Sequence, residues 1–583
     1  MKQYLCAPKR RPNAGEVAAQ PDDDGCLKRS HGSAFHRVPG RARGNWNRLG
    51  DLIGRARWRS LGATPAMPGT EIRLALEAIP MGGMKEGSAG DEKVLFVRDA
   101  SGVRAFQAKC PHLGAPLAKG EICGGRLYCP WHKAAFALAD GSLEEPPALD
   151  SLTRYLVRIE GSEAVATLTP APAPAKTASA VVESVLIVGS GAAAVACVKT
   201  LRREGYDGPI TMVGREAHPP YDRTKLSKQF LAKPTPPEKV LIEPDFDQIN
   251  KVERITGEVV KVDPSRRDIT LGDGRTFEAD AILVATGSRA VLPDFPGKDL
   301  GGVFILRSLD DAIRISEAAR AGGSVVVVGA GFIGMEAAAF LNKRGLSVTV
   351  LAREEVPFAK RFGEAVGAAL KQYHADNGVT FETGSVVRIT GISRVEAVET
   401  KDGRRLPADI VLVGAGADPE SSLIAGVEPG EGGGLEVGGD LKLADGVWIA
   451  GDIATFPERA SGETARIEHW RLAQQHGTHV AHAILGRSGV FAGAPFFWSN
   501  QGDKRLDYGG YAKGFDRIIV QGDPAALDFI AYYVTGDRVT AACSIGRNSA
   551  FTAFLHLLGL GSLPSAAEIE AGADLPTLAR EAA

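Results

Sequence analysis

Three features of the sequence predict a multidomain protein of the α/β class. Short segments of alternating apolar residues come first, a unit of buried strand, Gly-rich turn and helix then occurs twice, and short strands return near the end of the chain. The chain has 583 residues. This is too long for one hydrophobic core, because single domains usually hold about 100 to 200 residues. We therefore expect several domains along the chain.

The overall composition excludes several classes of protein. Hydrophobic residues make up 44% of the chain and the formal charge is -2, as in an ordinary soluble protein without a nucleic-acid partner. No apolar run approaches the roughly 18 residues of a membrane span, and the N-terminus lacks the apolar core of a secretory signal. We expect a cytoplasmic monomer or homodimer with no membrane partner. In that reducing compartment, the seven cysteines are expected to be metal ligands or buried thiols and not disulfides.

The N-terminal stretch differs from the rest of the chain. Residues 1–66 hold 13 Lys or Arg against 5 Asp or Glu and show no apolar periodicity. Such a segment cannot bury enough apolar surface to fold, so we expect a disordered basic segment over residues 1–66. Met67, just before "PGTEIRLALEAIP", is a candidate for the true start of the protein.

A small β domain is expected over residues 67–168. Segments such as "KVLFVRDASGVRAFQAKC" alternate apolar and polar residues and are separated by turn residues, which is typical of antiparallel strands. The following "TPAPAPAKTASA", residues 169–180, is a semi-rigid Pro- and Ala-rich linker. We expect the domain before this linker to be able to stand alone.

Two short stretches of this β domain carry candidate metal ligands. "KCPHLGAPL" contains Cys110 and His112, and "YCPWHKAAF" contains Cys129 and His132, with sixteen residues between His112 and Cys129. Zinc sites usually group like ligands together, whereas each stretch here supplies one thiol and one imidazole. This arrangement suits a [2Fe-2S] cluster in which two Cys hold one iron and two His hold the other. The alternatives are a structural zinc site and core residues that bind no metal. Cys123, between the stretches, is interpreted as a buried or free thiol.

The two stretches resemble the cluster loops, CxH and CxxH, of the Rieske family, and the resemblance covers about 100 residues. It implies a Rieske [2Fe-2S] cluster held by the four residues named above. High-potential members of that family carry a Ser and a Tyr in the second loop, where this chain has Ala134 and Phe136. Because hydroxyl groups that donate to sulfur stabilise the reduced cluster, the resemblance implies a low potential here.

The middle of the chain contains one unit twice. "SVLIVGSGAAAVACVKTLRREG" begins at Ser184 and "SVVVVGAGFIGMEAAAFLNKRG" begins at Ser324, 140 residues later. Each is a buried strand, a Gly-rich turn and a helix, which is the pattern of a Rossmann-like dinucleotide-binding unit. In the first unit, Gly189 permits the tight turn, Gly191 lets the backbone approach a pyrophosphate, and Ala194 lets the helix pack on the strand. Two dinucleotide sites are therefore predicted.

The first unit resembles the FAD half of the two-dinucleotide-binding-domain flavoproteins. The segments that carry the resemblance are "ITMVGRE", "PPYDRTKLSK", "ATGSRA" and "VWIAGDIA". The resemblance implies an FAD-binding domain in two parts, residues 181–305 and 419–487. We expect Glu216 to end its strand and to bind ribose hydroxyls, and Asp452 to hold the ribityl chain. The other implied FAD contacts are Arg223, Lys228, Ala285, Thr286, Gly287, Arg289 and Gly451.

The second unit resembles the NAD(P) half of the same family, over residues 306–418. Its Gly-rich turn contains Gly329, Gly331 and Gly334. Glu336, taken to lie two residues into the helix, matches a catalytic position that faces the nicotinamide and flavin rings in the family. An exposed helical Glu is the alternative.

The residues after the next strand leave the choice between NADH and NADPH open. Arg353 could accept a 2′-phosphate and would favour NADPH, whereas Glu354 could accept a 2′-hydroxyl and would favour NADH.

The last part of the chain is expected to form an α+β reductase domain over residues 488–583, with the character of a dimerisation domain. "RIEHWRLAQQHG" and "PFFWSNQ" resemble ferredoxin reductases of the oxygenase type and apoptosis-inducing-factor-like proteins. Trp470, a catalytic candidate, and Trp498 could border the flavin ring, or could simply belong to the core. No CxxxxC pair follows the first Gly-rich helix, which argues against a disulfide reductase.

Together with the N-terminal β domain, the resemblance extends to Rieske-containing, apoptosis-inducing-factor-like flavoproteins. It implies an FAD-dependent NAD(P)H oxidoreductase that passes electrons from NAD(P)H through FAD to a fused Rieske cluster. The expected partner is an unidentified electron acceptor, such as an oxygenase or a cytochrome P450. The alternative function is an NAD(P)H-dependent flavin redox sensor or an apoptosis-inducing-factor-like protein with slow turnover.

Overall fold

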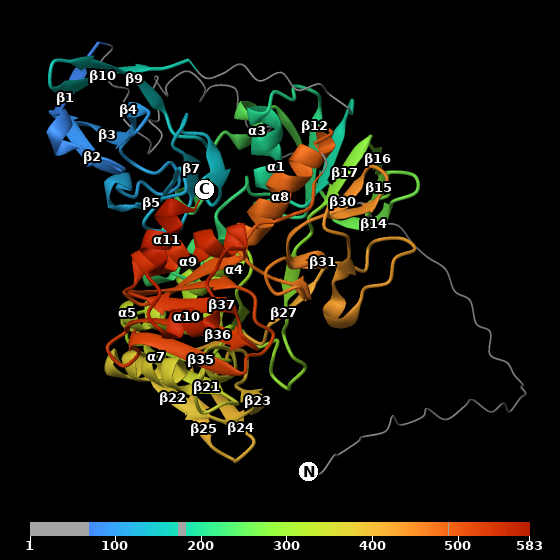
Figure 1. Cartoon of the computed structure of the whole chain (residues 1–583). Helices are drawn as coiled ribbons and strands as arrows, with labels where there is room; N and C mark the ends of the chain where they lie inside the picture. Colours follow the sequence, from blue (N-terminus) through green and yellow to red (C-terminus); the bar gives the residue numbers. More distant parts are fainter. Residues whose placement is uncertain (1–68, 173–181, 488, 583) are drawn as a thin grey trace, which may run out of the picture. The chain divides into compact units, whose positions relative to one another are not determined.

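The computed structural model describes residues 69–172, 182–487 and 489–582, drawn as ribbon in Figure 1. All of these residues belong to one compact unit, Gly62–Ala583. The expected basic segment over residues 1–66 and the candidate start at Met67 lie outside the described residues, as does the expected linker from residue 173 on. The observed architecture confirms the predicted fold class of an antiparallel β region, two parallel-sheet regions and a C-terminal antiparallel region.

The N-terminal region is built from two antiparallel sheets. The first has the strand order β1-β10-β9-β4-β3-β2 and the second has the order β5-β6-β7-β8. The cluster loops flank the second sheet, since one follows β4 and the other joins β6 to β7. The strands are β1 (Glu71–Ala75), β2 (Gly83–Ala89), β3 (Glu92–Asp99), β4 (Gly102–Gln107), β5 (Glu121–Cys123), β6 (Arg126–Tyr128), β7 (Ala135–Ala137), β8 (Leu143–Glu145), β9 (Arg154–Glu160) and β10 (Glu163–Pro170).

The first repeat of the sequence forms a parallel sheet in the order β13-β12-β11-β17-β30, to which β29 adds an antiparallel edge. Its central strands are wholly apolar and buried, as expected for a sheet covered on both faces. The elements are β11 (Val185–Val188), α1 (Ala192–Arg203), β12 (Ile210–Gly214), β13 (Val252–Thr256), β17 (Ala281–Val284), β29 (Lys442–Ala444), β30 (Val447–Ile449) and α8 (Trp470–Ile484).

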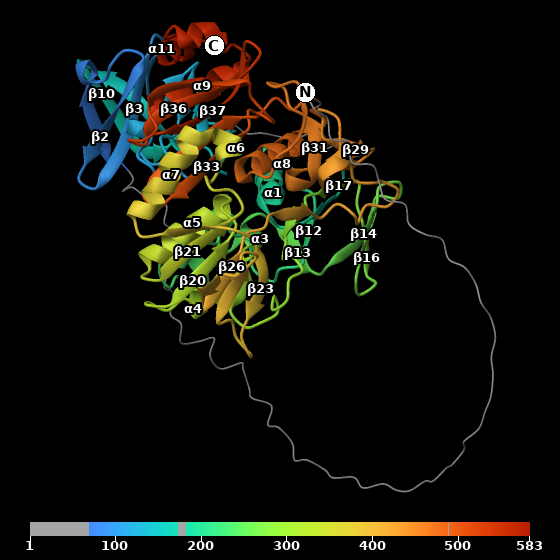
Figure 2. The ribbon, with the colours of Figure 1, turned by 90° about the horizontal axis from the view of Figure 1, so that it is seen from below.

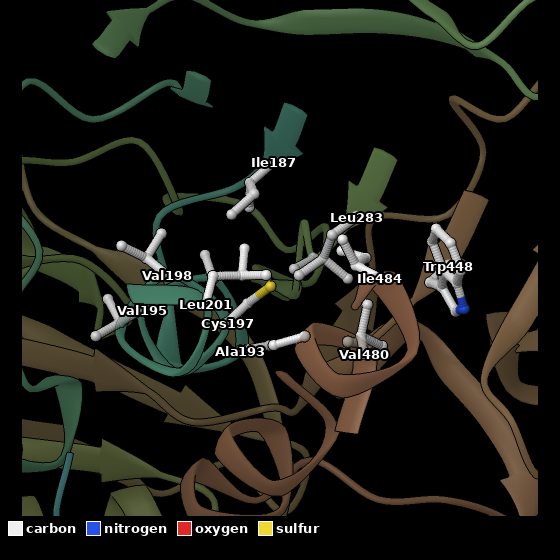
Figure 3. Packing of buried hydrophobic residues seen from close by; sticks show 14 of the residues in the cluster. Ile187, Ala193, Val195, Cys197, Val198, Leu201, Leu283, Trp448, Val480 and Ile484 are labelled. Carbon is white, nitrogen blue, oxygen red and sulfur yellow. The ribbon is translucent and has the colours of Figure 1, made fainter. Parts of the chain in front are cut away.

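Helices α1 and α8 pack closely together on this sheet, and Figure 3 shows their apolar side chains interlocking. Val195, Cys197 and Val198 from α1 share one buried cluster with Val480 and Ile484 from α8. A Cβ atom on Gly477 of α8 would lie 2.0 Å from the carbonyl oxygen of Ala193. Only glycine permits so close an approach of the helices, which places the middle of α8 against the first turn of α1.

The second repeat forms a parallel sheet in the order β19-β26-β20-β21-β22. Its Gly-rich turn leads from β20 into α5, as the corresponding turn leads from β11 into α1. The elements are β19 (Val303–Ile305), α4 (Leu309–Ala318), β20 (Ser324–Val328), α5 (Phe332–Lys343), β21 (Ser347–Ala352), α6 (Ala359–Phe362), α7 (Glu364–Asp376), β22 (Thr380–Thr383) and β26 (Ile410–Val413).

Small sheets and short helices connect these two regions. The connecting elements are α2 (Gln229–Ala232), α3 (Phe246–Ile249), β14 (Val259–Asp263), β15 (Asp268–Leu271), β16 (Thr276–Glu278), β18 (Ser288–Ala290), β23 (Val386–Thr390), β24 (Ala397–Thr400), β25 (Arg405–Pro407), β27 (Ala417–Pro419), β28 (Leu435–Glu436), β31 (Ala454–Pro457) and β32 (Thr464–Arg466). A longer antiparallel sheet follows them in the chain and belongs to the C-terminal region.

The C-terminal region is an antiparallel sheet in the order β33-β34-β37-β36-β35, followed by three helices. Its elements are β33 (Phe496–Gln501), β34 (Lys504–Gly510), β35 (Arg517–Asp523), β36 (Asp528–Thr535), β37 (Arg538–Ile545), α9 (Asn548–Leu560), α10 (Ala566–Glu570) and α11 (Leu575–Glu581). In the described part of the chain, no helix combines the length and the apolar character needed to cross a membrane.

The N-terminal β region packs on the C-terminal region, and its expected ability to stand alone stays a prediction. Figures 1 and 2 both show the blue strands beside the red helices α9 and α11. Cys123, Tyr128 and Ala135 join a buried cluster made mostly of C-terminal residues, and the Tyr128 hydroxyl lies 3.0 Å from Nδ1 of His556. The sequence does not reveal this packing, because the two faces that meet are more than 300 residues apart and each is apolar only in short pieces.

Candidate functional site

The two cluster loops have the same local geometry. In each loop the Cys amide donates to the carbonyl oxygen five residues further on, from Cys110 to Ala115 and from Cys129 to Ala134, both at 2.8 Å. Each loop therefore curls back on its own Cys, which turns the thiol and the following imidazole toward the opposite loop. The four predicted ligands come together in this way.

The ligands are arranged as a pair of thiols and a pair of imidazoles. Cys110 and Cys129 are buried and share a hydrogen bond, which raises the pKa of Cys110 and lowers that of Cys129. The rings of His112 and His132 lie 5.0 Å apart, centroid to centroid. Two sulfur ligands on one side and two nitrogen ligands on the other match the requirement of a Rieske cluster, in which each iron takes one pair.

The imidazoles are in the form that binds metal. Burial lowers the pKa of His112 to about 4 and that of His132 well below its ordinary value, so both rings are neutral. Nδ1 of His132 is buried and has no hydrogen-bond partner within the described residues. An orphaned imidazole nitrogen beside a thiol pair fits an iron ligand. Across the described ranges, no three His, Cys, Asp or Glu side chains surround a single ion position.

Lys133 directly follows the last ligand and is unusual in two respects. Its φ is 57°, in the left-handed region, where a side chain other than glycine costs about 1 to 2 kcal/mol. Its side chain is fully buried, which lowers its pKa to about 8. The sequence predicts neither the left-handed backbone nor the burial of Lys133, because both depend on contacts made in the folded chain.

A second site is a continuous cavity of about 960 Å³ between the two parallel-sheet regions, a volume sufficient for large ligands. Most of the predicted dinucleotide contacts line it. These are Gly189, Gly191, Glu216, Arg223, Lys228, Ala285, Thr286, Gly287, Arg289, Gly331, Gly334, Glu336, Gly451, Asp452, Trp470 and Trp498.

Four predicted residues lie away from the cavity wall. Ala194 is buried within α1, where its small side chain lets the helix approach the sheet. Gly329 lies at the strand end, and Arg353 and Glu354 are exposed after β21. The Glu354 carboxylate pairs with Lys360 at 2.9 Å. The choice between the two nicotinamide nucleotides therefore stays open.

The Gly-rich turn of the first region is shaped to receive a phosphate. Gly189 has a φ of 114°, and a Cβ atom there would lie 2.2 Å from the carbonyl oxygen of Ala285. A Cβ atom on Gly191 would meet no atom within 4 Å, since this residue faces the cavity at the N-terminus of α1. The amides at a helix N-terminus bind anionic groups, so the turn fits the pyrophosphate of a dinucleotide.

Glu216 and Arg223 form one polar group on the cavity wall. The structure corrects the expectation that Glu216 ends its strand, because β12 ends at Gly214 and Glu216 lies in the loop beyond it. Arg223 donates to the Glu216 carboxylate at 2.5 Å, and the Tyr221 hydroxyl donates to the same carboxylate. The carboxylate is thereby held in place beside the cavity, and its position depends on a loop interaction that no strand pattern reveals.

Asp452 has partners that the sequence does not reveal. Arg307 donates to its carboxylate at 2.7 Å, and the Ser288 hydroxyl donates to the same oxygen at 3.1 Å. Both partners line the cavity. Arg307 belongs to the segment before α4, which carries no recognised motif, so only the folded chain brings it to this position.

Glu336 is buried and tightly held, so the alternative of an exposed helical Glu is wrong. It is the fifth residue of α5, which begins at Phe332, and not the second as expected. Lys228 pairs with one carboxylate oxygen at 2.8 Å, and the Ser227 hydroxyl donates to it at 2.5 Å. The Ser499 hydroxyl donates to the other oxygen at 2.7 Å. A buried carboxylate with this many donors is held in a fixed position within the cavity wall.

The two tryptophans have different surroundings. Trp470 begins α8 and lines the cavity. Trp498 also lines the cavity, but its ring lies 4.3 Å from that of His132 and 6.3 Å from that of His112, centroid to centroid. His469, which sequence reasoning missed, lines the cavity with a buried Nδ1 that has no partner in the described part of the chain.

These features define a class of protein: a flavin-dependent oxidoreductase of nicotinamide nucleotides that also carries a Rieske-type iron–sulfur site. Residues 183–477 match the model of the pyridine nucleotide-disulphide oxidoreductase family, and the chain belongs to that family. Residues 74–156 match the Rieske [2Fe-2S] domain, and residues 496–579 match the reductase C-terminal domain. The predicted cofactor classes are confirmed by these matches.

Known relatives support this assignment. The chain is 36% identical over 510 residues to apoptosis-inducing factor 3 of Homo sapiens, covering 84% of each chain. It is 36% identical over 352 residues to the ferredoxin reductase component of chlorobenzene dioxygenase from Cupriavidus sp. (strain PS12), covering 59% of this chain and 85% of the relative. The crystal structure of the covalent putidaredoxin reductase–putidaredoxin complex matches with a TM-score of 0.64 at 29% identity, covering 68% of this chain and 99% of that chain.

Proposed function

We propose that this protein moves electrons from NAD(P)H, by way of FAD, to a Rieske cluster held in the same chain, and from there to a separate acceptor. When bound, FAD accepts a hydride and can release single electrons, which nicotinamide cannot usefully do. The chain's own residues bind these groups, orient them and exclude water between them. One structural observation carries the proposal, namely the position of Trp498.

Trp498 touches both candidate sites. Trp498 lines the dinucleotide cavity, and its ring also packs on the imidazole of His132. His132 is buried and the side chain of His112 is only 12% exposed, so water is largely excluded from the contact. A continuous packed path between the cavity and the cluster ligands supports electron transfer within one chain.

The cavity residues have separable roles in this proposal. Gly189 and Gly191 receive the pyrophosphate of FAD, and Asp452, held by Arg307, receives hydroxyls of the ribityl chain. The orphaned Nδ1 of His469 fits a polar ligand atom at the N-terminus of α8. Glu336 and Lys228, both on the cavity wall, fix the geometry at which the nicotinamide meets the flavin.

A separate acceptor must come close to the cluster, and two exposed apolar residues lie beside the His ligands. Leu113 and Trp131, the neighbours in sequence of the two His ligands, are 40% and 41% exposed although they are large and apolar. We propose that a one-electron acceptor protein approaches at these two residues. The relative named as a component of chlorobenzene dioxygenase supports an acceptor of the oxygenase class.

Trp131→Ala should slow the reduction of added cytochrome c without slowing the reduction of the cluster. Equal rates of cytochrome c reduction by the variant and the wild type would contradict this.

The proposal is tested by removing the cluster alone. In the full-length Cys129→Ser variant, NAD(P)H-dependent reduction of cytochrome c should be lost, whereas reduction of ferricyanide, a small acceptor, should persist. Cys543→Ser provides the matched control, because Cys543 is also a buried thiol but lies in the C-terminal sheet. Full cytochrome c reduction by Cys129→Ser would mean that electrons leave the flavin directly and that the cluster has another role.

A further inference from the structure

Among the described residues, the hydrogen-bond and ion-pair partners of the buried Lys133 side chain belong to the C-terminal region. Its Nζ donates to Oδ1 of Asn548, the first residue of α9, and lies 3.9 Å from the carboxylate of Asp507 on β34. The backbone of Lys133 lies in the left-handed region and its ammonium is fully buried, and both features cost free energy. The interactions that offset both costs lie across the contact with the reductase.

Arg505 completes the same polar group from the other side. Its guanidinium donates to Asp507 at 2.9 Å, to Asn548 at 3.3 Å, and to the carbonyl oxygen of Pro130 in the second cluster loop at 3.2 Å. The loop is thus held at two points, once by its own Lys133 side chain and once through the Pro130 carbonyl. The ligand His132 lies between these two points in the sequence, directly before Lys133.

The strand pairing links this group to the electron path. Trp498 on β33 is the direct cross-strand partner of Asp507 on β34. Two consecutive loop residues therefore meet two paired strand residues, since the His132 ring packs on Trp498 while the Lys133 ammonium lies near Asp507. Any movement of the loop away from β34 must also separate His132 from Trp498.

We propose that Lys133 is a positioning residue, which anchors the second cluster loop to Asn548 and Asp507 and thereby holds His132 against Trp498 for electron transfer within the chain. This inference rests on the proposed function above. Lys133 is not a ligand and does not touch the reacting groups. Lys133 acts through the position of its neighbour His132. Its effect should therefore appear only in the rate of electron transfer from the flavin to the cluster.

The experiment is a double-mutant cycle on the full-length protein. Lys133→Met removes the ammonium but keeps the aliphatic chain, and Asn548→Ala removes the acceptor without touching the cluster loop or its charge. The control is Lys251→Met, since Lys251 also has a left-handed backbone, with a φ of 48°, but is exposed. After rapid anaerobic mixing with NAD(P)H, flavin bleaching should be unchanged in all variants.

Cluster reduction should be slower by about tenfold in each single variant, equivalent to about 1.4 kcal/mol. The double variant should be slowed by less than the product of the two single effects, because both substitutions remove the contact between Lys133 and Asn548. The EPR spectrum of the dithionite-reduced cluster should keep its g values. Cluster reduction in Asn548→Ala as fast as in the wild type, or additive losses in the double variant, would overturn the proposal.

Hydrogen exchange gives a readout that does not depend on electron transfer. The amides of β6 and β7, which flank the second loop, should exchange faster in Lys133→Met and in Asn548→Ala but not in Lys251→Met. Unchanged exchange would overturn the anchoring role. If wild-type flavin is bleached but its cluster stays oxidised, the proposed function fails instead, and the exchange data still decide whether Lys133 anchors the loop.

Discussion

The two Gly-rich turns of this molecule have the same backbone conformation but differ in their surroundings. Gly189 and Gly329 both have positive φ, and a Cβ atom on either would lie within 2.4 Å of a carbonyl oxygen on a neighbouring strand. The acid that follows the first unit, Glu216, is held by Arg223 on the cavity wall. The corresponding residues of the second unit, Arg353 and Glu354, are exposed and lie away from that wall.

This difference suits the two ligands that the sites are proposed to bind. A pre-formed, half-buried set of contacts retains a resident group such as FAD, because the binding residues lose little freedom on binding. An exposed set of specificity residues suits a nucleotide that must enter and leave at every turnover. The comparison therefore predicts that equivalent changes in the two turns have unequal consequences.

The largest expected effect is that of Gly191→Val. A Cβ atom at this position would meet no protein atom within 4 Å, so the chain should fold normally while the valine side chain occupies the space for the pyrophosphate. We expect the purified variant to lack flavin absorbance and all NAD(P)H oxidation, with an unchanged circular dichroism spectrum. Full flavin occupancy in this variant would mean that the FAD site has been misplaced.

Gly331→Val makes the equivalent change in the second turn. A Cβ atom on Gly331 also meets no atom within 4 Å. This variant should keep its flavin and its reduction by dithionite, but should lose reduction by NAD(P)H. If Gly331→Val also purified without flavin, the two turns would not serve two separate ligands and the comparison would fail.

A smaller effect is expected from Glu336→Gln. The change leaves Lys228 buried without its anionic partner, and contacts of this kind contribute about 1.5 to 3 kcal/mol. Reduction of the flavin by NAD(P)H should therefore slow by about tenfold to a hundredfold. Rapid mixing measures this rate directly, and flavin content should not change. The control Glu355→Gln replaces an exposed Glu, and a similar loss in that variant would remove the special role of Glu336.

The smallest effect is expected from Arg353→Ala. The side chain is exposed, so a contact with a 2′-phosphate would contribute about 1 kcal/mol. The variant should lower kcat/KM for NADPH by about fivefold and leave the value for NADH unchanged. Equal losses with the two nucleotides would instead favour Glu354 as the residue that contacts the ribose.

Much of this organisation could be predicted from the sequence, because it depends on local patterns. The fold class, the two Gly-rich turns and the pairing of the two cluster loops follow from short motifs in which each residue type has a physical reason. The residue boundaries of the predicted domains and the role of each predicted site residue stay predictions. The position of Asp452 on the cavity wall also follows from its motif, whereas its partner Arg307 does not.

The parts that could not be predicted depend on contacts between distant segments. Nothing in "CPWHKAAF" shows that Lys133 is buried, because its partners Asp507 and Asn548 come more than 370 residues later. In the same way, Trp498 could be predicted as a neighbour of the flavin from its motif, but its contact with His132 requires the docked position of the N-terminal region. The sequence pattern of that region is complete in itself and predicts a domain that can stand alone, so it does not reveal this contact.

The most direct test of internal electron transfer is an anaerobic titration of the full-length protein with NADH and with NADPH, followed by absorbance and EPR. We predict that at least one nucleotide, without any mediator, first bleaches the flavin and then produces the EPR signal of the reduced cluster. The account would be contradicted if both nucleotides left the cluster oxidised after full bleaching of the flavin, while dithionite then reduced the cluster in the same sample.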